Sequence, residues 1–305
     1  MNPHKVILAG GTGFLGQVLI DHWKNPFTEL IVLSRQPRPS HNNVRYVEWD
    51  GKTIGPWAAE LEGADAVINL AGRSVDCRYT EANRRAILTS RTDSTAVLGK
   101  AIWQCSSPPR CWINAASATI YRHAMDRPMD EETGEMENDF SVQVCKSWEQ
   151  TFWSATVPPS VRRICLRVAI VLGRGGGVLP VLQRLAQVGL GGTMGGGNQY
   201  VSWLHERDFA RIIDYALTNE HLTGTFNASA PGPVRNRDFM RVLRNACGVW
   251  FGLPATAWML EIGAFFLQTE TELILKSRNV VPKKLLEAGF EFEFPTVEKA
   301  LDSLA

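Results

Sequence analysis

Three glycines near the start of the chain have the spacing of a loop that binds phosphate. Gly10, Gly13 and Gly16 lie between an apolar run at 6–9 and a helical pattern of apolar residues. Glycine permits positive φ angles and close backbone approach, and a helix N-terminus offers N–H groups to a pyrophosphate. A glycine pattern alone is weak evidence, but this strand–loop–helix context predicts a dinucleotide site; the alternative is a glycine turn that binds nothing.

The residues after the second apolar run, 30–33, indicate which dinucleotide the loop would hold. An NAD-selective site carries an acidic residue there for the ribose 2′-hydroxyl. This chain has Ser34, Arg35 and Arg38 instead, and no carboxylate between 34 and 38. Because arginine suits a phosphate and serine adds a hydroxyl, we expect NADP(H) to bind better than NAD(H) by roughly 1.5–3 kcal/mol. The alternative is that both arginines are solvated loop charges.

An alternation of strand-like and helical segments would position these loops. Such an alternation predicts a doubly wound α/β fold with a parallel sheet, and right-handed crossovers place the ligand-binding loops at one edge of that sheet. The expected strands are 6–9, 30–33, 44–49, 66–70, 112–116 and 163–168, with another near 225–227. The expected helices are 80–100, 141–155, 179–187, 206–217 and 236–247, with a last one from 296.

The composition excludes several classes of protein. Of 305 residues, 32 are Lys or Arg and 31 are Asp or Glu. A formal charge of +1 offers no electrostatic surface to nucleic acid or an anionic membrane. Six cysteines form no C-x-x-C pair and no metal site, and the N-terminus has no signal peptide, so we expect a soluble cytoplasmic protein. Pro254 and Glu261 interrupt the most apolar window, 250–267, which we expect to be a buried or amphipathic helix.

Several motifs resemble those of extended short-chain dehydrogenases/reductases. These are the glycine loop and the segments 69–72, 116–121 and 203–210. More narrowly, the segments 87–91, 171–177, 190–203 and 281–290 are similar to the atypical, YfcH-like branch labelled "epimerase family protein". The last of them belongs to a short C-terminal domain of that branch, some members of which are labelled cell-division inhibitors.

The resemblance implies a Rossmann fold, bound NADP(H) and an unassigned small-molecule substrate. It implies that Thr12, Phe14 and Leu15 line the pyrophosphate, and that the adenine side and ribose lie against Leu70, Ala71 and Gly72. We expect a Rossmann domain at 1–172, to which 203–230 returns. The segments 173–202 and 231–305 would form a smaller substrate lobe packed on the sheet, with a glycine-dense wall at 191–197.

The resemblance also implies a catalytic set, which this chain carries only in part. In the superfamily, the Tyr of a Tyr-x-x-x-Lys pair transfers a proton, the Lys lowers the pKa of the Tyr, and a Ser or Thr holds the substrate oxygen. Ser117 matches the Ser; its alternative role is to cap a strand end. Ser141 and Cys145 stand where Tyr and Lys should be, and a shift of one residue places Val142 and Lys146 there. Neither register supplies a tyrosine.

Other residues near the expected site have structural alternatives. Tyr121 could move a proton, but packing explains it as well, and a loop histidine such as His123 is more often solvated. Cys145 is expected to be buried and inert rather than a reactive thiol. For the remaining polar and aromatic candidates we expect capping, solvent exposure or packing at least as readily as chemistry; they are 130–132, Gln199, Tyr200, Trp203, His205 and Asp208.

Two hypotheses follow from the residues and the resemblance. The first is an NADP(H)-dependent oxidoreductase or epimerase-like enzyme that acts on a small molecule such as a sugar nucleotide or a carbonyl compound, with Ser117 polarising the substrate. The second is a catalytically inactive NADP(H)-binding sensor or scaffold, with a link to cell division through the label of some relatives. The expected partners are a small-molecule substrate and a second copy of the chain in a homodimer, but neither nucleic acid nor a membrane.

Overall fold

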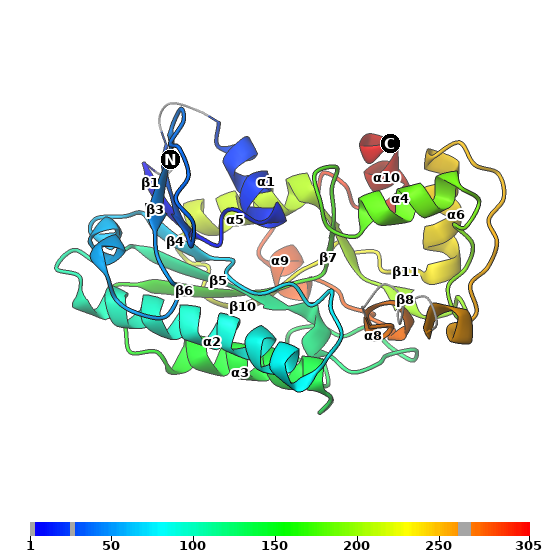
Figure 1. Ribbon diagram of the computed structural model, residues 1–305, viewed down its shortest axis with the longest axis horizontal. Helices are drawn as coiled ribbons and strands as arrows, with labels where there is room; N and C mark the ends of the chain where they lie inside the picture. Colours follow the sequence, from blue (N-terminus) through cyan, green and yellow to red (C-terminus); the bar gives the residue numbers. More distant parts are fainter. Residues whose placement is uncertain (1–3, 25–27, 262–269) are drawn as a thin grey trace.

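A parallel sheet forms the centre of the molecule in the computed structural model, which describes residues 4–24, 28–261 and 270–305 (Figure 1). The sheet has seven strands in the order β10-β6-β5-β4-β1-β2-β3. They are β1 (Lys5–Ala9), β2 (Glu29–Ser34), β3 (Val44–Glu48), β4 (Ala66–Asn69), β5 (Cys111–Ser117), β6 (Arg162–Val168) and β10 (Gly224–Ala228). All six pairings between these strands are parallel. The predicted doubly wound fold is confirmed.

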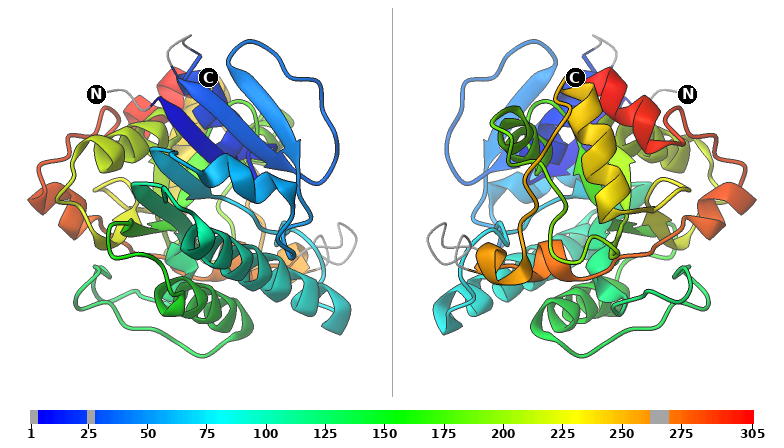
Figure 2. Two further views of the ribbon diagram at one scale, coloured as in Figure 1. Left: turned by 90° about the vertical axis from the view of Figure 1, so that its left-hand side faces the viewer. Right: turned by 90° about the vertical axis from the view of Figure 1, so that its right-hand side faces the viewer.

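Helices cover both faces of this sheet (Figure 2). One face carries α1 (Phe14–His22) and α5 (Glu206–Thr218), and the other carries η1 (Pro56–Leu61), α2 (Glu81–Gln104) and α3 (Phe140–Ser154). Successive side chains of a strand point to opposite faces. Val6 and Leu8 of β1 therefore pack with α1 and α5, whereas Ile7 and Ala9 pack with α2 and α3. Burial on both faces explains why the strands read as unbroken apolar runs.

A smaller lobe lies beside the sheet, at the right of Figure 1. Its core includes Leu179, Trp203, Phe239 and Leu301. Its elements are α4 (Leu179–Gln187), α6 (Asn236–Ala246), α10 (Val297–Leu304) and the short strands β7 (Ile170–Leu172), β8 (Tyr200–Val201), β9 (Trp203–His205) and β11 (Val234–Arg235). Two more short helices precede α10, namely α8 (Glu272–Leu275) and α9 (Lys283–Glu287).

The C-terminal part of the chain is divided between this lobe and the sheet. Leu285 of α9 and Phe290 after it are buried in the same core as α1 and α5. The aromatic ring of Phe290 also packs edge-on against Tyr215 of α5. Residues 283–292, which we assigned to the substrate lobe, therefore pack with the sheet, and Phe294 and α10 return to the lobe core.

Two polar residues at the start of α5 hold the C-terminal segment in place. His205 caps α5 by accepting a hydrogen bond from the Arg207 N–H, and its ring stacks on Phe294 with the centroids 3.7 Å apart. Asp208 is fully buried and accepts hydrogen bonds from the backbone N–H groups of Glu293 and Phe294, both at 2.9 Å. Burial holds the pKa of His205 down to about 4. The structural roles considered for both residues are confirmed.

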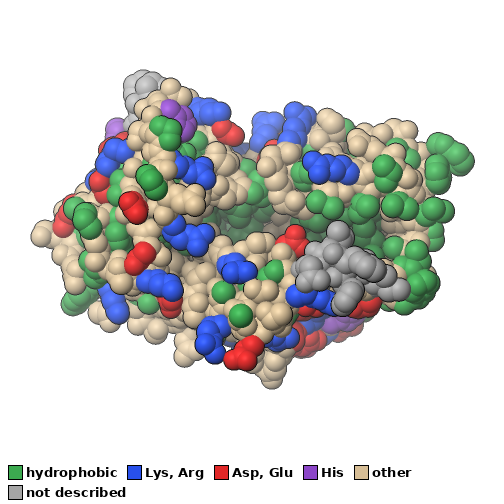
Figure 3. All heavy atoms as spheres, viewed as in Figure 1, with side chains coloured by type: hydrophobic (Ala, Val, Ile, Leu, Met, Phe, Trp, Pro, Cys, Tyr) green, Lys and Arg blue, Asp and Glu red, His purple; other side chains and the backbone are tan. Residues whose placement is uncertain are grey.

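The apolar window at 250–267 differs from our expectation. Residues 257–261 are helical, but Trp250 is 89% exposed and Trp258 is 64% exposed, so the expected burial is wrong for the described part of this window. Hydrophobic side chains gather at the right-hand end of the molecule in Figure 3, which is the end formed by the smaller lobe. The rest of the window, 262–269, lies outside the described residues. Within the described ranges, no helix is both long and apolar enough to pass through a bilayer.

Candidate functional site

A cavity of about 540 Å³ runs along the carboxyl ends of β1, β2 and β4. This is the edge of a doubly wound sheet at which ligands bind. The predicted cofactor-binding residues that line it are Gly10, Thr12, Gly13, Ser34, Arg35, Leu70, Ala71 and Gly72. Asn69 supports the 70–72 turn from below, because its side-chain oxygen accepts a hydrogen bond from the Ala71 N–H and its amide nitrogen donates to Thr95 and Asn114.

The glycine loop requires glycine for reasons that differ from one position to the next. Gly10 has φ of +78°, and a Cβ there would lie 2.8 Å from the backbone of Ala71. A Cβ on Gly16 would lie 2.3 Å from the backbone of Gly11, so this glycine lets α1 start directly against the loop. Gly13 caps α1 without a side-chain hydrogen bond. The positive end of the helix therefore faces the cavity with backbone N–H groups as its donors.

Four predicted cofactor-binding residues are not among the described residues that line the cavity. The Phe14 side chain packs against Gly176 and lines a separate cavity on the far side of the loop, and Leu15 packs on the sheet core. Their contact with a pyrophosphate could come only from their backbone N–H groups. Gly16 acts through packing, as described above. Arg38 is exposed and lies outside the cavity lining.

The ribose end of the cavity carries a cation that the sequence did not single out. Lys52 lines the cavity together with Arg35. Asp50 closes the turn that presents Lys52, because its carboxylate accepts hydrogen bonds from the N–H groups of Lys52 and Thr53, both at 2.8 Å. Ser34 orders the neighbouring loop by donating its hydroxyl proton to the Gln36 carbonyl at 2.8 Å. Two positive side chains in one cavity suit a phosphate on the ribose.

A second cavity, of about 100 Å³, adjoins the first. Arg91 lines this second cavity and lies against Gly72, which lines the first. Ser117, at the end of β5, also lines the second cavity. The Ser117 hydroxyl donates to the Thr119 hydroxyl at 3.0 Å and accepts from the Thr119 N–H at 3.2 Å. Ser117 therefore caps the short helix η2 (Ala118–Ile120), and because it also lines the cavity its action on a substrate stays a prediction.

The same cavity shows what replaces the Tyr-x-x-x-Lys pair. Ser141 and Cys145 of α3 line it beside Ser117, as the first sequence register predicted. Lys146 points away, and its ammonium group donates to the Glu137 carbonyl at 2.7 Å and to Asn138 at 2.9 Å. Burial raises the pKa of the Cys145 thiol to about 12, so the thiol stays protonated and inert.

The structure does not bring Tyr121 to this cavity, which corrects the prediction that Tyr121 is a catalytic candidate. Tyr121 is 1% exposed and does not belong to the described cavity lining. Its hydroxyl donates to Asn227 at 2.9 Å and accepts from Arg167 at 2.8 Å. Arg167 in turn forms a buried two-pronged ion pair with Glu149, with both N···O distances at 2.8 Å. Tyr121 is therefore part of a buried polar network.

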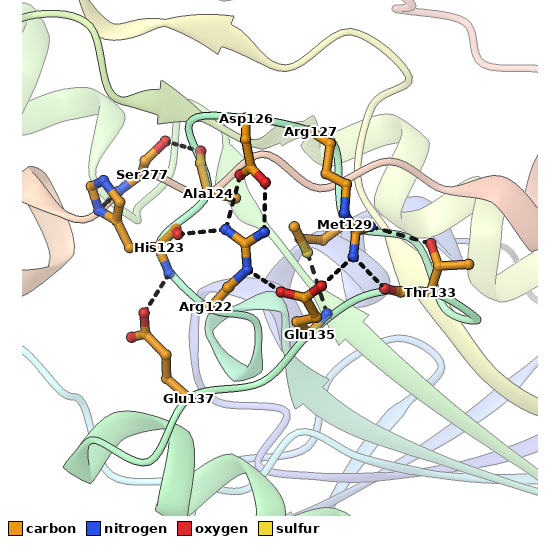
Figure 4. Close-up of polar contacts among 10 residues, drawn as sticks. All are labelled: Arg122, His123, Ala124, Asp126, Arg127, Met129, Thr133, Glu135, Glu137 and Ser277. Atoms are coloured by element: carbon orange, nitrogen blue, oxygen red, sulfur yellow. Dashed lines mark hydrogen bonds and ion pairs between the residues drawn. The ribbon is translucent and has the colours of Figure 1, made fainter.

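Ion pairs fix the loop between Tyr121 and α3, shown in Figure 4. Arg122 contacts Asp126 and Glu135, and Arg127 contacts Glu135. The His123 ring accepts a hydrogen bond through Nδ1 from the Ser277 N–H at 3.1 Å. His123 thus links this loop to the C-terminal segment, and it does not belong to the described lining of either cavity.

The neighbouring acidic run and the aromatic residues of the lobe also have structural partners. Asp130 closes its own turn, Glu131 accepts from the Asn227 N–H at 2.8 Å, and Glu132 pairs with Lys283. Gln199 donates to the Met194 carbonyl at 2.8 Å, and the Trp203 indole donates to the Gly232 carbonyl at 3.0 Å. Tyr200 is half-buried, with Arg235 above its ring. These contacts match the structural alternatives.

Two further side chains in the small cavity were missed as site residues. Tyr79 precedes Thr80, the residue that caps α2, and Arg91 lies about three turns into that helix. The guanidinium of Arg91 lies over the Trp148 ring, 5.2 Å from its centroid. Burial lowers the pKa of Arg91 and raises that of Tyr79. Arg91 belongs to the 87–91 segment noted above, but nothing local marks Tyr79.

Comparison with known proteins agrees with this arrangement. Residues 6–228 match the model of the NAD dependent epimerase/dehydratase family. The chain belongs to this family. Residues 255–304 match a domain of unknown function, DUF1731, which confirms the short C-terminal domain expected from the resemblance. The family match covers the glycine loop, both cavities' β-strand ends and β10, whereas α8, α9 and α10 fall in the C-terminal domain.

Similar proteins are found in animals and bacteria. The bovine epimerase family protein SDR39U1 is 32% identical over 97% of this chain and 98% of its own length, and YfhF of Bacillus subtilis is 31% identical over 98% and 97%. The crystal structure of human SDR39U1 with NADPH has a TM-score of 0.87 and 30% identity, and 99% of each chain is covered. A nucleoside-diphosphate sugar epimerase from Corynebacterium glutamicum has a TM-score of 0.78 and 25% identity over 99% of this chain and 58% of that one.

Proposed function

We propose that this protein binds NADP(H) and uses it to oxidise or reduce a small carbonyl or hydroxyl compound. The observation that carries the proposal is the adjoining pair of cavities, one lined by a phosphate-binding loop and three cations (Arg35, Lys52 and Arg73), the other by Ser117. The human relative solved with NADPH supports the choice of cofactor. When bound, NADP(H) supplies or accepts a hydride at nicotinamide C4.

Different residues of the large cavity would bind different parts of the cofactor. The N–H groups at the start of α1, behind Gly13, would hold the pyrophosphate. Arg35 and Lys52 would hold the 2′-phosphate, because each is a cation in the cavity lining near the end of β2 or β3. The turn at 70–72, held by Asn69, would support the adenine side and ribose.

Ser117 would act on the substrate. A hydroxyl at the end of β5 can donate a hydrogen bond to a substrate oxygen and stabilise the negative charge that develops on it. The small cavity is about 100 Å³, so it holds a reacting group rather than a whole large molecule. A hydroxyl-bearing sugar nucleotide or a carbonyl compound meets this requirement, and the Corynebacterium relative is named for an activity on nucleoside-diphosphate sugars.

Two measurements test this function. In the first, NADPH and NADH are titrated into the purified protein while the thermal midpoint is followed, because a ligand that binds the native state raises it. In the second, deuteride transfer from 4-deuterated NADPH to hexanal is measured by mass spectrometry, and NADP⁺ reduction is followed with UDP-glucose. A midpoint shift with NADPH and transfer to any probe support the proposal. Absence of a shift with either nucleotide contradicts it.

A second candidate function is an inactive NADP(H) sensor or scaffold. The observation that favours it is the presence of Ser141 and Cys145 where the family pattern has Tyr and Lys. Such a protein would show the NADPH-dependent midpoint shift but no deuteride transfer to any probe. Cytoplasmic location and homodimerisation stay predictions; cell fractionation and sedimentation of the purified chain test them.

A further inference from the structure

The small cavity has one charged side chain in its described lining. Arg91 is that side chain, and the described lining contains neither a carboxylate nor a histidine. Burial raises the pKa of the Cys145 thiol and of the Tyr79 hydroxyl, so both stay protonated and uncharged at neutral pH. Arg91 therefore brings a positive charge to a cavity whose described lining carries no negative charge to balance it.

The Arg91 side chain is held in one orientation. Its guanidinium lies over the Trp148 ring, and its Nη1 atom donates to the backbone carbonyls of Ile87 at 3.0 Å and Arg73 at 3.1 Å. Trp148 is fixed in turn, because its indole N–H donates to the buried Thr95 hydroxyl at 3.0 Å. A cation that is already in place loses little conformational freedom when a ligand binds to it.

One edge of the Arg91 guanidinium is left for a ligand. Within the described part of the chain, its Nε and Nη2 atoms have no hydrogen-bond or ion-pair partner. Arg167 uses the same edge to bind a carboxylate, since its Nε and Nη2 atoms each donate to one oxygen of Glu149, both at 2.8 Å. The two N–H groups of this edge are parallel and match the two oxygens of a carboxylate. Arg91 thus offers the pair of donors that Arg167 has already filled.

The hydroxyl groups of the cavity differ in how firmly they are bonded. The Ser141 hydroxyl donates to a carboxylate oxygen, Glu272 Oε2, at 2.9 Å. The Ser117 hydroxyl donates only to the Thr119 hydroxyl, which lines the same cavity. A hydroxyl proton rotates from a neighbouring hydroxyl to a substrate oxygen more easily than it leaves a charged acceptor. The cavity therefore has two points of attachment, Arg91 for an anionic group and Ser117 for a reacting oxygen.

We propose that Arg91 determines the substrate class by binding a carboxylate that lies close to the reacting carbon, whose oxygen Ser117 holds. The proposal rests on the proposed function, which supplies the hydride. Arg91 and Ser117 line one cavity of about 100 Å³, so the carboxylate and the reacting carbon must be only one or two carbons apart. A free 2-oxo or 2-hydroxy acid has this arrangement, and so does an acidic sugar carried on a nucleotide.

The roles of the two residues follow from the charges in the reaction. When a 2-oxo acid is reduced, its carbonyl carbon gains a hydride from NADPH and its carbonyl oxygen gains one proton from solvent, which gives the 2-hydroxy acid and NADP⁺. The carboxylate keeps its charge throughout, so Arg91 binds substrate and product alike and acts on KM. Negative charge develops on the carbonyl oxygen, so Ser117 acts on kcat.

A binding experiment with matched ligands tests the carboxylate site without turnover. Racemic lactate and lactamide are similar in shape, but only lactate carries a carboxylate. With NADPH bound neither can be oxidised, so the thermal midpoint reports binding alone. We expect lactate to raise the midpoint beyond that of the NADPH complex and lactamide to leave it unchanged, with sodium chloride as the control for ionic strength. Equal shifts with both ligands, or none with lactate, would overturn the proposal.

Substitution of Arg91 shows where the carboxylate binds. Arg91→Gln should abolish the lactate-dependent shift and keep the NADPH-dependent one, because Arg91 lines the small cavity and not the large one. Arg91→Lys keeps the charge but lacks the parallel donors, so the lactate-dependent shift should shrink without vanishing. Arg85→Gln is the matched control on α2, since Arg85 is exposed and pairs with Glu81. A full lactate-dependent shift in Arg91→Gln would place the carboxylate elsewhere and contradict the proposal.

Turnover measures the specificity that follows from this site. Deuteride transfer from 4-deuterated NADPH to pyruvate is compared with transfer to pyruvamide and hexanal, and NADP⁺ reduction with UDP-glucuronate is compared with reduction by UDP-glucose. Preference for pyruvate indicates a free acid, and preference for UDP-glucuronate indicates an acid on a nucleotide. For the preferred acid, Arg91→Gln should raise KM by about a hundredfold with little change in kcat, because hydrogen bonds between charged groups are lost. Kinetics with the neutral probes should not change.

The two proposals can fail separately. If hexanal or UDP-glucose reacts and neither acid is preferred to its neutral counterpart, the carboxylate site is wrong and the proposed function stands. If lactate binds through Arg91 but no probe exchanges a hydride with the cofactor, the proposed function is wrong and Arg91 still marks a carboxylate site. Loss of the NADPH-dependent shift in Arg91→Gln also overturns the carboxylate site, because Arg91 would then serve the cofactor.

Discussion

The two ends of the cofactor cleft are built in different ways. At the pyrophosphate end, one short stretch, 10–16, supplies the turn and the helix N-terminus, and backbone atoms make the site. At the reaction end, Ser117, Ser141 and Tyr79 come from three elements, and side chains make the site. A backbone site depends on a few glycines at fixed spacing. A side-chain site can exchange its chemical groups while the fold stays the same.

The largest expected effect lies at the backbone end. Gly16→Ala places a Cβ about 2.3 Å from the Gly11 backbone, where no flexible side chain can yield. We expect the free energy of unfolding to fall by about 3 kcal/mol. We also expect the NADPH-dependent midpoint shift to be lost. Chemical denaturation measures it. Gly175→Ala is the matched control, since a Cβ there meets nothing within 4 Å. Equal stability of the two variants would contradict the packing argument.

A side-chain substitution at the reaction end should leave folding and cofactor binding intact. We expect Ser117→Ala to lower kcat on the most active carbonyl probe by roughly a hundredfold, the loss found when one donor to a developing oxyanion is removed. Steady-state kinetics measure kcat, and the NADPH-dependent midpoint shift should match that of the wild type. Ser154→Ala, at the exposed end of α3, is the control. Unchanged turnover in Ser117→Ala would remove this residue from the mechanism.

The preference for NADPH over NADH should depend on only one of two arginines for which the sequence analysis predicted the same role. Arg35 lines the cavity and Arg38 does not. Arg35→Ala should weaken NADPH binding by about 2 kcal/mol, the contribution of a hydrogen bond to a charged group, and leave NADH binding unchanged. Arg38→Ala should leave both unchanged. Isothermal titration with each nucleotide measures the difference, and an equal loss in the two variants would show that the loop acts only through its net charge.

The smallest effect lies away from both ends of the cleft, at His205. Its pKa is about 4 in the folded protein and near 6.5 when unfolded, so above pH 6.5 both states are neutral. As the pH falls below 6.5 only the unfolded state takes up a proton, and stability should fall by about 1 kcal/mol between pH 7.5 and pH 5.5. Urea denaturation across this range measures it. His205→Asn, which can still cap α5, should lack this part of the pH dependence.

The strands, the main helices and the pyrophosphate loop could be predicted from the sequence because their signals are local. Each strand is an apolar run, and Gly10, Gly13 and Gly16 lie within the short segment 10–16, between the first strand and the first helix. Ser117 was found for the same reason, since it is the last residue of β5. The first register for α3 was confirmed because the helix period alone decides which of Cys145 and Lys146 faces the cavity.

The residues that were missed have signals that are not local. Lys52 reaches the cavity through a turn that Asp50 closes after β3, and nothing in the local sequence relates that turn to the loop after β1. Ser141 and Glu272 are hydrogen-bonded across 131 positions of chain. The window 250–267 was expected to be a buried or amphipathic helix, and the exposure of Trp250 and Trp258 shows that apolar character alone does not decide which residues a fold covers.

The bonds from Asp208 to the C-terminal segment have a consequence for how the chain is made. Asp208 is fully buried by backbone groups that follow it by 85 and 86 positions. A ribosome that adds 5–20 residues per second needs roughly 4 to 17 seconds to reach them. During that interval the part of α5 that residues 285–294 cover stays exposed to water, so we expect a chaperone to bind the nascent chain until these residues have been made.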